Sequence, residues 1–143
     1  VPFFARWPGK VQAGSESAQV ITHTDLFATV AAIAGAKVPK GAAADSYSFL
    51  PLLLGKAKGY ARPPVIHHSS SGMFAIRDGD WKLVLGNGSG GRQQPRGKAF
   101  EKPYFLANIK THGDEQENFA EAEPAIAKRL EEIFQKIHKN ERR

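Results

Sequence analysis

The chain has 143 residues, of which 41% are hydrophobic, a composition that is typical of a folded protein and argues against wholesale disorder. The lack of cysteine excludes disulfides, zinc–thiolate sites and thiol catalysis within these residues, and no apolar run approaches the ~18 residues that a membrane span requires. The net charge of +6 suits an anionic partner, but lysine and arginine form no stripe interleaved with aromatic residues, so we expect no specific nucleic-acid binding.

The chain begins with an apolar stretch, VPFFAR at residues 1–6, which is typical of a buried strand in the middle of a fold. We therefore expect a fragment of a longer protein. Residues 22–39 predict a helix, with Thr24 as the N-cap and Gly35 as the stop. Its apolar residues recur at helical spacing and form a wide stripe, so we expect much of its surface to be covered. They are Leu26, Phe27, Val30, Ala31, Ile33 and Ala34.

A boundary between two parts of the chain is predicted near its middle. Residues 48–56 form a short apolar helical turn that ends at Gly55. Residues 56–64 are basic and rich in glycine and proline, which is typical of a surface link. We therefore divide the chain into residues 1–58 and residues 59–143.

A hairpin is predicted around the dipeptide Asp78–Gly79, a common two-residue type I′ turn. In this register Arg77 faces Asp80 as an opposite-charge pair of modest value. The register also places the large apolar side chains on one face of the hairpin. They are Phe74, Ile76, Trp81, Leu83 and Leu85. A slip by one residue would mix the two faces, so the register should be well specified.

The remainder predicts one further strand and one long helix. Residues 86–103 form a long, glycine-rich polar loop, residues 104–109 a strand, and residues 110–118 another loop. From Pro124 onward, an apolar stripe with acidic residues at its start and basic residues at its end predicts an amphipathic helix. The fold class is therefore α/β, with an α+β C-terminal part in which one long helix packs on a small antiparallel sheet.

Five segments, in this order, match the characteristic segments of one enzyme family. VPFFARWPGK resembles VPFIVRWPG, and THTDLFATVAAIAG resembles the family's Thr-Asp-Leu helix. DSYSFLPLLLGK is similar to DGxSLLPLLxG, and MFAIRDGDWKLV is similar to xxAIRxGxWKLI. FLANIKTHGDEQEN is a weaker match to LYDLxxDPxExxN. Essentially the whole chain thus resembles the C-terminal portion of the sulfatases, the arylsulfatase-like members of the alkaline-phosphatase-type hydrolases.

This resemblance implies that residues 1–58 are the tail of an N-terminal α/β sulfatase core and residues 59–143 a C-terminal subdomain. Sulfatases hydrolyse sulfate esters with a formylglycine, made from the Cys or Ser of a Cys/Ser-x-Pro-x-Arg motif, and a calcium ion held by Asp and Asn oxygens. This chain has neither that motif nor an Asp pair suited to calcium. We therefore expect no catalytic or metal-binding residue in the chain, and no activity from the chain alone.

The resemblance further implies that the partner of this chain is the missing N-terminal sulfatase domain, which would carry the nucleophile and the calcium. The substrate would be a small sulfated molecule, such as a sulfated sugar or an aryl sulfate. A periplasmic or secreted location is typical of the family, although the sequence itself leaves the location unknown. Three positions depart from the family pattern, all in loops or turns: Ser46, Asn108 and the pair His112–Gly113.

His67 and His68 are the first candidate substrate-binding residues. Neighbours on a strand point to opposite faces, so the two rings are unsuited to sharing one metal ion. No acid is apparent that could orient a catalytic pair between a histidine and residues 69–71. Two interpretations stay open: a structural role, with one ring facing the sheet and one facing solvent, or a place at the rim of the substrate cleft, which the family's small sheet borders.

Ser89 and Arg92, in the glycine-rich loop, are the second pair of candidates. Glycine-rich backbone can approach an anion closely, and these side chains could bind a sulfated substrate. The alternative is a flexible, solvated loop.

Two other functions remain open for the chain as a whole: a stand-alone basic module that binds acidic glycans or nucleic acid, and a fragment of a related phosphatase.

Overall fold

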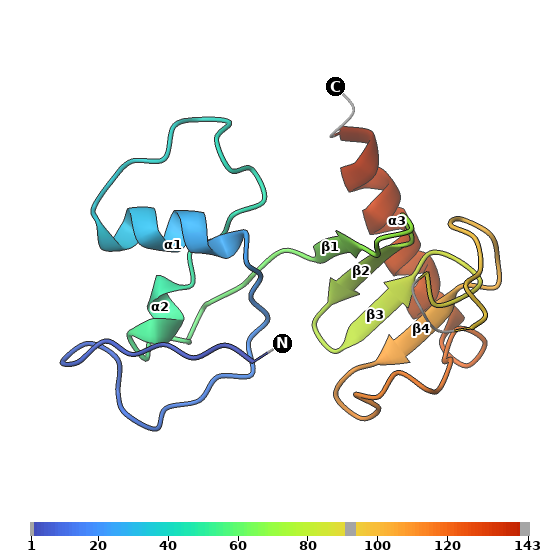
Figure 1. Ribbon diagram of the computed structural model, residues 1–143, viewed down its shortest axis with the longest axis horizontal. Helices are drawn as coiled ribbons and strands as arrows, with labels where there is room; N and C mark the ends of the chain where they lie inside the picture. The colour runs from blue at the N-terminus through green and yellow to red at the C-terminus, as the bar shows by residue number, and fades with distance from the viewer. Residues whose placement is uncertain (1, 91–93, 141–143) are drawn as a thin grey trace. The chain divides into compact units, whose positions relative to one another are not determined.

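The computed structural model describes residues 2–90 and 94–140, and the chain separates into two compact units, Val1–Arg62 and Pro63–Arg143 (Figure 1). Unit 1 contains two helices, α1 (Asp25–Ile33) and α2 (Leu50–Leu53). Unit 2 contains four strands and one helix: β1 (Val65–His68), β2 (Phe74–Asp78), β3 (Trp81–Val84), β4 (Phe105–Asn108) and α3 (Pro124–Asn140). Within the described ranges, no helix has both the length and the apolar character needed to cross a bilayer.

Unit 2 is an antiparallel sheet of strand order β1-β2-β3-β4, with α3 packed across one face (Figure 1). The apolar face of the sheet and the apolar stripe of α3 enclose one core. Its fully buried members are Ile76, Leu83, Leu85, Leu106, Leu130 and Phe134. Each such side chain contributes about 1.5–3 kcal/mol by leaving water. The predicted sheet with one long helix on it is confirmed, and so is Pro124 as the first residue of that helix.

The predicted hairpin register is wrong: each residue of β2 faces a residue of β3 that lies two positions further along the chain than predicted. Asp78 lies opposite Trp81 and Ile76 lies opposite Leu83, so the loop residues are Gly79 and Asp80. Because the side-chain period of a strand is two, this shift leaves the same residues on each face. The hydrophobic pattern therefore could not distinguish the predicted register from the observed one.

A tertiary ion pair accompanies the observed register and, with the core residues, stabilises it. The Asp78 carboxylate accepts a hydrogen bond from the Arg129 guanidinium of α3 at 2.6 Å, which places Asp78 inside the strand. Gly79 then takes the first loop position with φ 57°, as type II′ turns require. Arg77 consequently faces Lys82, and the predicted Arg77–Asp80 pair is not formed.

The segment before α3 is anchored by Asn118. Its Oδ1 accepts hydrogen bonds from the backbone N–H groups of Leu106, at 2.9 Å, and Ala120, at 3.0 Å. Its Nδ2 donates to the carbonyl oxygen of Tyr104 at 3.0 Å. One side chain thus joins β4 to the approach of α3. Asn118 is the final residue of the weakest of the five matching segments, and this linkage gives it a structural role.

Unit 1 departs from the sequence predictions at its start. Residues 2–6 form no strand, and Phe4 is 91% exposed. The prediction of a buried strand is wrong for this chain because a strand needs a hydrogen-bonded partner, and the described residues offer none beside residues 2–6. The helical turn is confirmed as α2, and Gly55 follows it with φ 69°.

Helix α1 buries its polar side and exposes its apolar side. Asp25 and Thr29 are its buried residues, whereas Val30 is 59% exposed. Leu26, Phe27 and Ile33 are exposed as well. The prediction that this helix is covered on much of its surface is therefore wrong for the chain as it stands, and the wide apolar stripe is left open to solvent.

Two of the positions that depart from the family pattern make defined hydrogen bonds, one within its own turn and one to the start of α1. Asn108 Oδ1 accepts from the backbone N–H groups of Lys110 at 3.1 Å and Thr111 at 3.2 Å, which closes the turn after β4. Ser46 Oγ accepts from the N–H of Ala28 at 2.9 Å and donates to the Thr24 carbonyl at 2.6 Å. Both side chains therefore suit the turns in which they lie.

Candidate functional site

Strand β1 places the two candidate histidines on opposite faces of the sheet. His67 lies opposite Ala75 and His68 opposite Phe74 in the antiparallel register with β2. Phe74 belongs to the face covered by α3, so His68 lies on that side and His67 on the other. The two rings cannot converge on one ion. Across the part of the chain that the structure describes, no group of three or more His, Cys, Asp or Glu side chains could hold a metal.

The His68 ring has a defined tautomer in its neutral form. Its Nδ1 lies 2.9 Å from the carbonyl oxygen of Ser69, which can only accept, so Nδ1 carries the proton. Nε2 is then a hydrogen-bond acceptor on an exposed side chain. The ring also contacts the Phe74 ring, with centroids 5.6 Å apart. His68 is thus oriented from both sides, which suits a residue that presents one nitrogen to a ligand.

His67 lies among charged groups on the other face of the sheet. Its pKa is lowered, first by loss of hydration around the ring and then by the positive charge of Lys82, while Glu115 opposes the shift. Lys82 is itself paired with Glu115, with Nζ 2.6 Å from Oε2. The lowered pKa favours the neutral imidazole, which suits hydrogen bonding more than charge–charge binding of a sulfate.

The serine run after β1 builds a turn rather than a catalytic pair. Ser69 Oγ accepts from the N–H of Met73 at 3.2 Å and lies 3.0 Å from Ser71 Oγ. Ser71 Oγ donates to the carbonyl oxygen of Gly90. Since the His68 ring bonds a backbone carbonyl and not a hydroxyl, the arrangement does not activate a serine nucleophile.

The glycine-rich loop is held by a backbone ladder where the structure describes it. The Ser89 N–H donates to the Pro95 carbonyl at 2.9 Å, and the Gly90 N–H donates to the Arg96 carbonyl at 3.0 Å. A Cβ on Gly88 would lie 2.6 Å from the Gly97 nitrogen, so these residues approach closely because both are glycine. Ser89 is fixed by this ladder beside the turn that follows β1. Arg92, the other candidate in this loop, lies outside the described residues.

A buried ion pair in unit 1 was not predicted from the sequence. Asp25 is 0% exposed, and its Oδ2 lies 2.8 Å from Nε of Arg62, whose side chain is 7% exposed. The backbone N–H groups of Thr22 and Tyr47 also donate to the Asp25 carboxylate, at 2.8 Å and 3.0 Å. Burial alone would raise the pKa of Asp25, but the bonds from Arg62, Tyr47 and Thr22 and the Arg62 charge outweigh it and lower the pKa.

This Asp25–Arg62 clasp has no local sequence signal, because its two charges lie in different segments of unit 1. Asp25 seemed to need no partner beyond the dipole at the start of its helix. The sequence shows only an acid at the start of α1 and, far along the chain in the basic link, an arginine with no assigned role; nothing in it indicates that the two side chains pair. The clasp fixes the end of the link against the start of α1, which is a structural role rather than a catalytic one.

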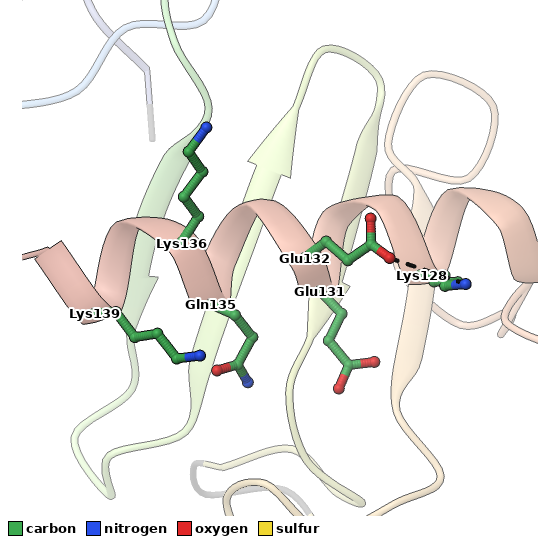
Figure 2. Close-up of a pocket in the computed structure, with 6 residues that line it drawn as sticks. All are labelled: Lys128, Glu131, Glu132, Gln135, Lys136 and Lys139. Atoms are coloured by element: carbon green, nitrogen blue, oxygen red, sulfur yellow. Dashed lines mark ion pairs between the residues drawn. The ribbon is translucent and has the colours of Figure 1, made fainter.

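A surface hollow lies along the outer face of α3 (Figure 2). It is lined by side chains of both signs: Lys128, Glu131, Glu132, Gln135, Lys136 and Lys139. Glu132 pairs with Lys128 at 4.0 Å, and Figure 2 shows Lys136 pointing away from Gln135 and Glu131. Diverging side chains of mixed charge do not form an anion site, so this face is a solvated helix surface.

Comparison with known proteins gives a consistent result, although no family model matches the chain. An N-acetylgalactosamine-6-O-sulfatase of Bacteroides thetaiotaomicron is 26% identical over 96% of this chain, which spans 27% of that protein. An ulvan-active sulfatase of Formosa agariphila is 52% identical over 39% of this chain and 11% of its own length. The chain thus spans about a quarter or less of the length of these curated relatives.

A solved structure shares the fold. It holds its substrate, D-glucosamine-2-N,6-O-disulfate, and superposes on 94% of this chain and 27% of its own with a TM-score of 0.69 at 20% sequence identity. The four-stranded antiparallel sheet and the helix packed on it are thus confirmed as a known architecture. Fold and sequence together confirm the resemblance of this chain to the C-terminal portion of the sulfatase family.

Proposed function

We propose that this chain is the C-terminal portion of a sulfatase that hydrolyses sulfate esters of a sulfated sugar or an aryl sulfate. The observation that carries the proposal is the match of nearly the whole chain, 96%, to about a quarter of an N-acetylgalactosamine-6-O-sulfatase. The relatives are sulfuric ester hydrolases, so the comparisons favour this function over a stand-alone binding module or a phosphatase fragment.

The nucleophile and the metal site are proposed to lie in an N-terminal domain that is the partner of this chain. The chain has no cysteine and no Cys/Ser-x-Pro-x-Arg motif from which a formylglycine could be made. Its described residues do not fit a calcium site either, because their carboxylates are not grouped. We therefore place the catalytic steps in the N-terminal domain and expect the chain alone to be inactive.

The open face of α1 supports a place for unit 1 at the end of a larger α/β core. Large apolar side chains at helical spacing normally lie against another element, and here they face solvent. The division of the protein would then be an N-terminal core that ends in residues 1–58 and a C-terminal subdomain of residues 59–143. The same N-terminal domain that supplies the catalytic groups would cover this face.

The contribution of unit 2 is proposed to be the rim of the substrate pocket. His68 would present its Nε2 to a substrate hydroxyl, and His67 would bind as a neutral imidazole on the other face of the sheet. Ser89 lies in the loop that the Ser71–Gly90 bond ties to the turn after β1, so it could reach the same rim as one of the histidines. Arg92 is kept as a candidate on sequence grounds. The family also supports a periplasmic or secreted location.

Turnover of 4-nitrophenyl sulfate tests this proposal. The 143-residue chain and the complete product of its gene are assayed side by side, each with calcium and with a chelator. We expect turnover by the complete product only, and its loss when the chelator is present. Metal-dependent turnover by the isolated chain would contradict the proposed division of labour, and an inactive complete product that instead hydrolyses a phosphate ester would assign a phosphatase.

A further inference from the structure

A cluster of rings from β1, β2, α3 and the loop before β4 lies in unit 2, and we call it the aromatic patch. Its members are His68, Phe74, Phe100, Phe134 and His138. The Phe74 ring is the centre, with ring centroids at 5.6 Å from His68, 5.8 Å from Phe100 and 5.6 Å from His138. Phe134 lies 5.5 Å from Phe74 and is stacked on His138 at 5.3 Å.

The patch has a buried floor and an open surface. Phe134 is completely buried, Phe74 and His138 are partly buried, and His68 is exposed. Phe100 is 46% exposed although its ring is stacked on Phe74 at an interplanar angle of 30°. A core aromatic gains most by full burial, so a half-exposed phenylalanine on this floor is not explained by core packing. The half-exposed Phe100 ring is the part of the patch that is open to a ligand.

The backbone of Phe100 is held in an unfavourable conformation. Its φ is 63°, in the left-handed region that bulky residues avoid. The neighbouring Gly97 has φ 65°, and there glycine takes the same region without cost. The Phe100 N–H donates to the carbonyl of Leu85 at 2.8 Å, which keeps the residue in place. A phenylalanine that destabilises its own turn, and stays half exposed, points to a role for the ring itself.

Polar groups surround the aromatic surface. His68 contributes Nε2 as an acceptor, since its Nδ1–H is committed to the Ser69 carbonyl at 2.9 Å. Lys98, two residues before Phe100, is 77% exposed and pairs loosely with Glu101 at 3.5 Å. An apolar face beside a hydrogen-bond acceptor matches a sugar ring, which carries both C–H groups and hydroxyl groups.

We propose that the aromatic patch binds one sugar ring of a sulfated saccharide. The apolar C–H face of the sugar stacks on the exposed Phe100 ring, which Phe74 supports from behind, and one of the sugar hydroxyls donates to His68 Nε2. This inference rests on the proposed function for its choice of a sulfated ligand. It deepens that function by assigning recognition of the sugar ring, rather than of the sulfate, to residues Phe100 and Phe74.

The test is an NMR titration of the 143-residue chain with N-acetylgalactosamine 6-sulfate. Saturable shifts are expected at the ring signals of Phe74, Phe100, His68 and His138. Unsulfated N-acetylgalactosamine should shift the same signals more weakly, and inorganic sulfate should not. Shifts elsewhere, or equal shifts at these rings with inorganic sulfate alone, would overturn the proposal.

The decisive variant is Phe100→Gly, which removes the ring and relieves the left-handed backbone, so the fold should be kept or stabilised. We expect binding to weaken about threefold to tenfold, the range that aromatic contacts supply. The matched control is Phe27→Ala, which removes an exposed phenylalanine of α1 and should bind like the wild type. A Phe100→Gly variant with unchanged affinity, or self-association of the chain that this substitution abolishes, would contradict a saccharide site.

A second pair of variants addresses the imidazole. His68→Asn keeps a donor near the Nδ1 position but lacks Nε2, whereas His68→Gln places an amide near Nε2. We expect the asparagine variant to bind about twofold to tenfold more weakly than the glutamine variant. Equal affinities would remove His68 from the proposal. Binding is scored separately from sulfatase turnover. If the wild-type chain binds no saccharide while the complete product hydrolyses sulfate esters, only the patch is overturned. If the wild-type chain binds at the patch while the complete product has no sulfatase activity, only the proposed function is overturned.

Discussion

The two units of this chain are stabilised in opposite ways. Unit 2 closes an apolar core between its sheet and α3, with six fully buried hydrophobic side chains. In unit 1, α1 buries Asp25 and Thr29 and turns its apolar side chains outward. A polar clasp can fix the position of a segment, but apolar burial supplies most of the folding free energy. We therefore expect unit 2 to be stable by itself and unit 1 to depend on a cover.

Each unit contains one of the two tryptophans, Trp7 in unit 1 and Trp81 in unit 2, which allows the comparison to be measured. Trp81→Phe leaves a reporter for unit 1, and Trp7→Phe leaves a reporter for unit 2. Urea unfolding of these two variants gives separate midpoints for the two units. The account predicts a lower midpoint for unit 1.

The largest effect is expected at the clasp in unit 1. Asp25→Asn leaves the Arg62 guanidinium buried without its counter-charge, and removing one partner of a buried pair costs about 3–5 kcal/mol. Unfolding followed through Trp7 should shift strongly, while unfolding followed through Trp81 should not. The control is Asp45→Asn, whose exposed residue should change stability by about 0.5 kcal/mol or less. Equal effects of the two variants would remove the clasp from the account.

A smaller effect is expected from a cavity in unit 2. Leu83→Ala removes a side chain that is 0% exposed and should destabilise unit 2 by about 2–5 kcal/mol. Val30→Ala, on the open face of α1, should cost unit 1 about 0.5 kcal/mol or less. The difference is read from urea midpoints of the single-tryptophan variants. A large loss from Val30→Ala would mean that α1 is covered within this chain.

Acid is expected to destabilise unit 1 through the same clasp. The pKa of Asp25 is lower in the folded chain than its ordinary value of 3.8. Its contribution to stability is therefore complete above that value and is lost as the pH falls through the folded pKa. The Trp7 midpoint should drop across this acidic range, and Asp25→Asn should remove that part of the pH dependence. A pH profile that the substitution leaves unchanged would assign the acid sensitivity to other groups.

The smallest effect is expected at the hairpin. The Arg129–Asp78 pair is partly exposed, so Asp78→Asn should cost unit 2 about 0.2–1 kcal/mol. NMR contacts between the backbones of Ile76 and Leu83 should persist, because the core residues also hold this register. Contacts that pair Phe74 with Leu83 in the variant would show that the ion pair alone selects the register.

The sequence predicted the elements that have a clear local residue pattern. An amphipathic stripe that starts at Pro124 predicted α3, and alternation predicted the faces of β2 and β3. The hairpin register was predicted wrongly because a shift of two residues keeps the same residues on both faces, and tertiary contacts such as that between Asp78 and Arg129 have no signal in the local pattern. The strand at residues 1–6 and the burial of the apolar face of α1 were predicted from apolar character. Apolar character indicates that a surface should be buried, but it does not indicate which segment buries it.

The candidate site was predictable only in part. The opposite orientation of His67 and His68 follows from strand geometry and is seen in the register. The Asp25–Arg62 clasp and the stacking of Phe100 on Phe74 join residues far apart in sequence, and no spacing rule indicates them. Phe100 lies in a polar, glycine-rich loop, and its left-handed backbone could not be predicted because phenylalanine rarely adopts that conformation.

Cysteine labelling on α1 tests the central claim most directly, because this chain has no cysteine of its own. Val30→Cys is introduced on the open face of α1, and Gln135→Cys on the solvated face of α3 serves as the control. Labelling by a maleimide is quantified at each site by peptide mass spectrometry, in the 143-residue chain and in the complete gene product. The account predicts that both sites react in the chain, and that only the site on α3 reacts in the complete product. Equal labelling of the α1 site in both proteins would contradict it.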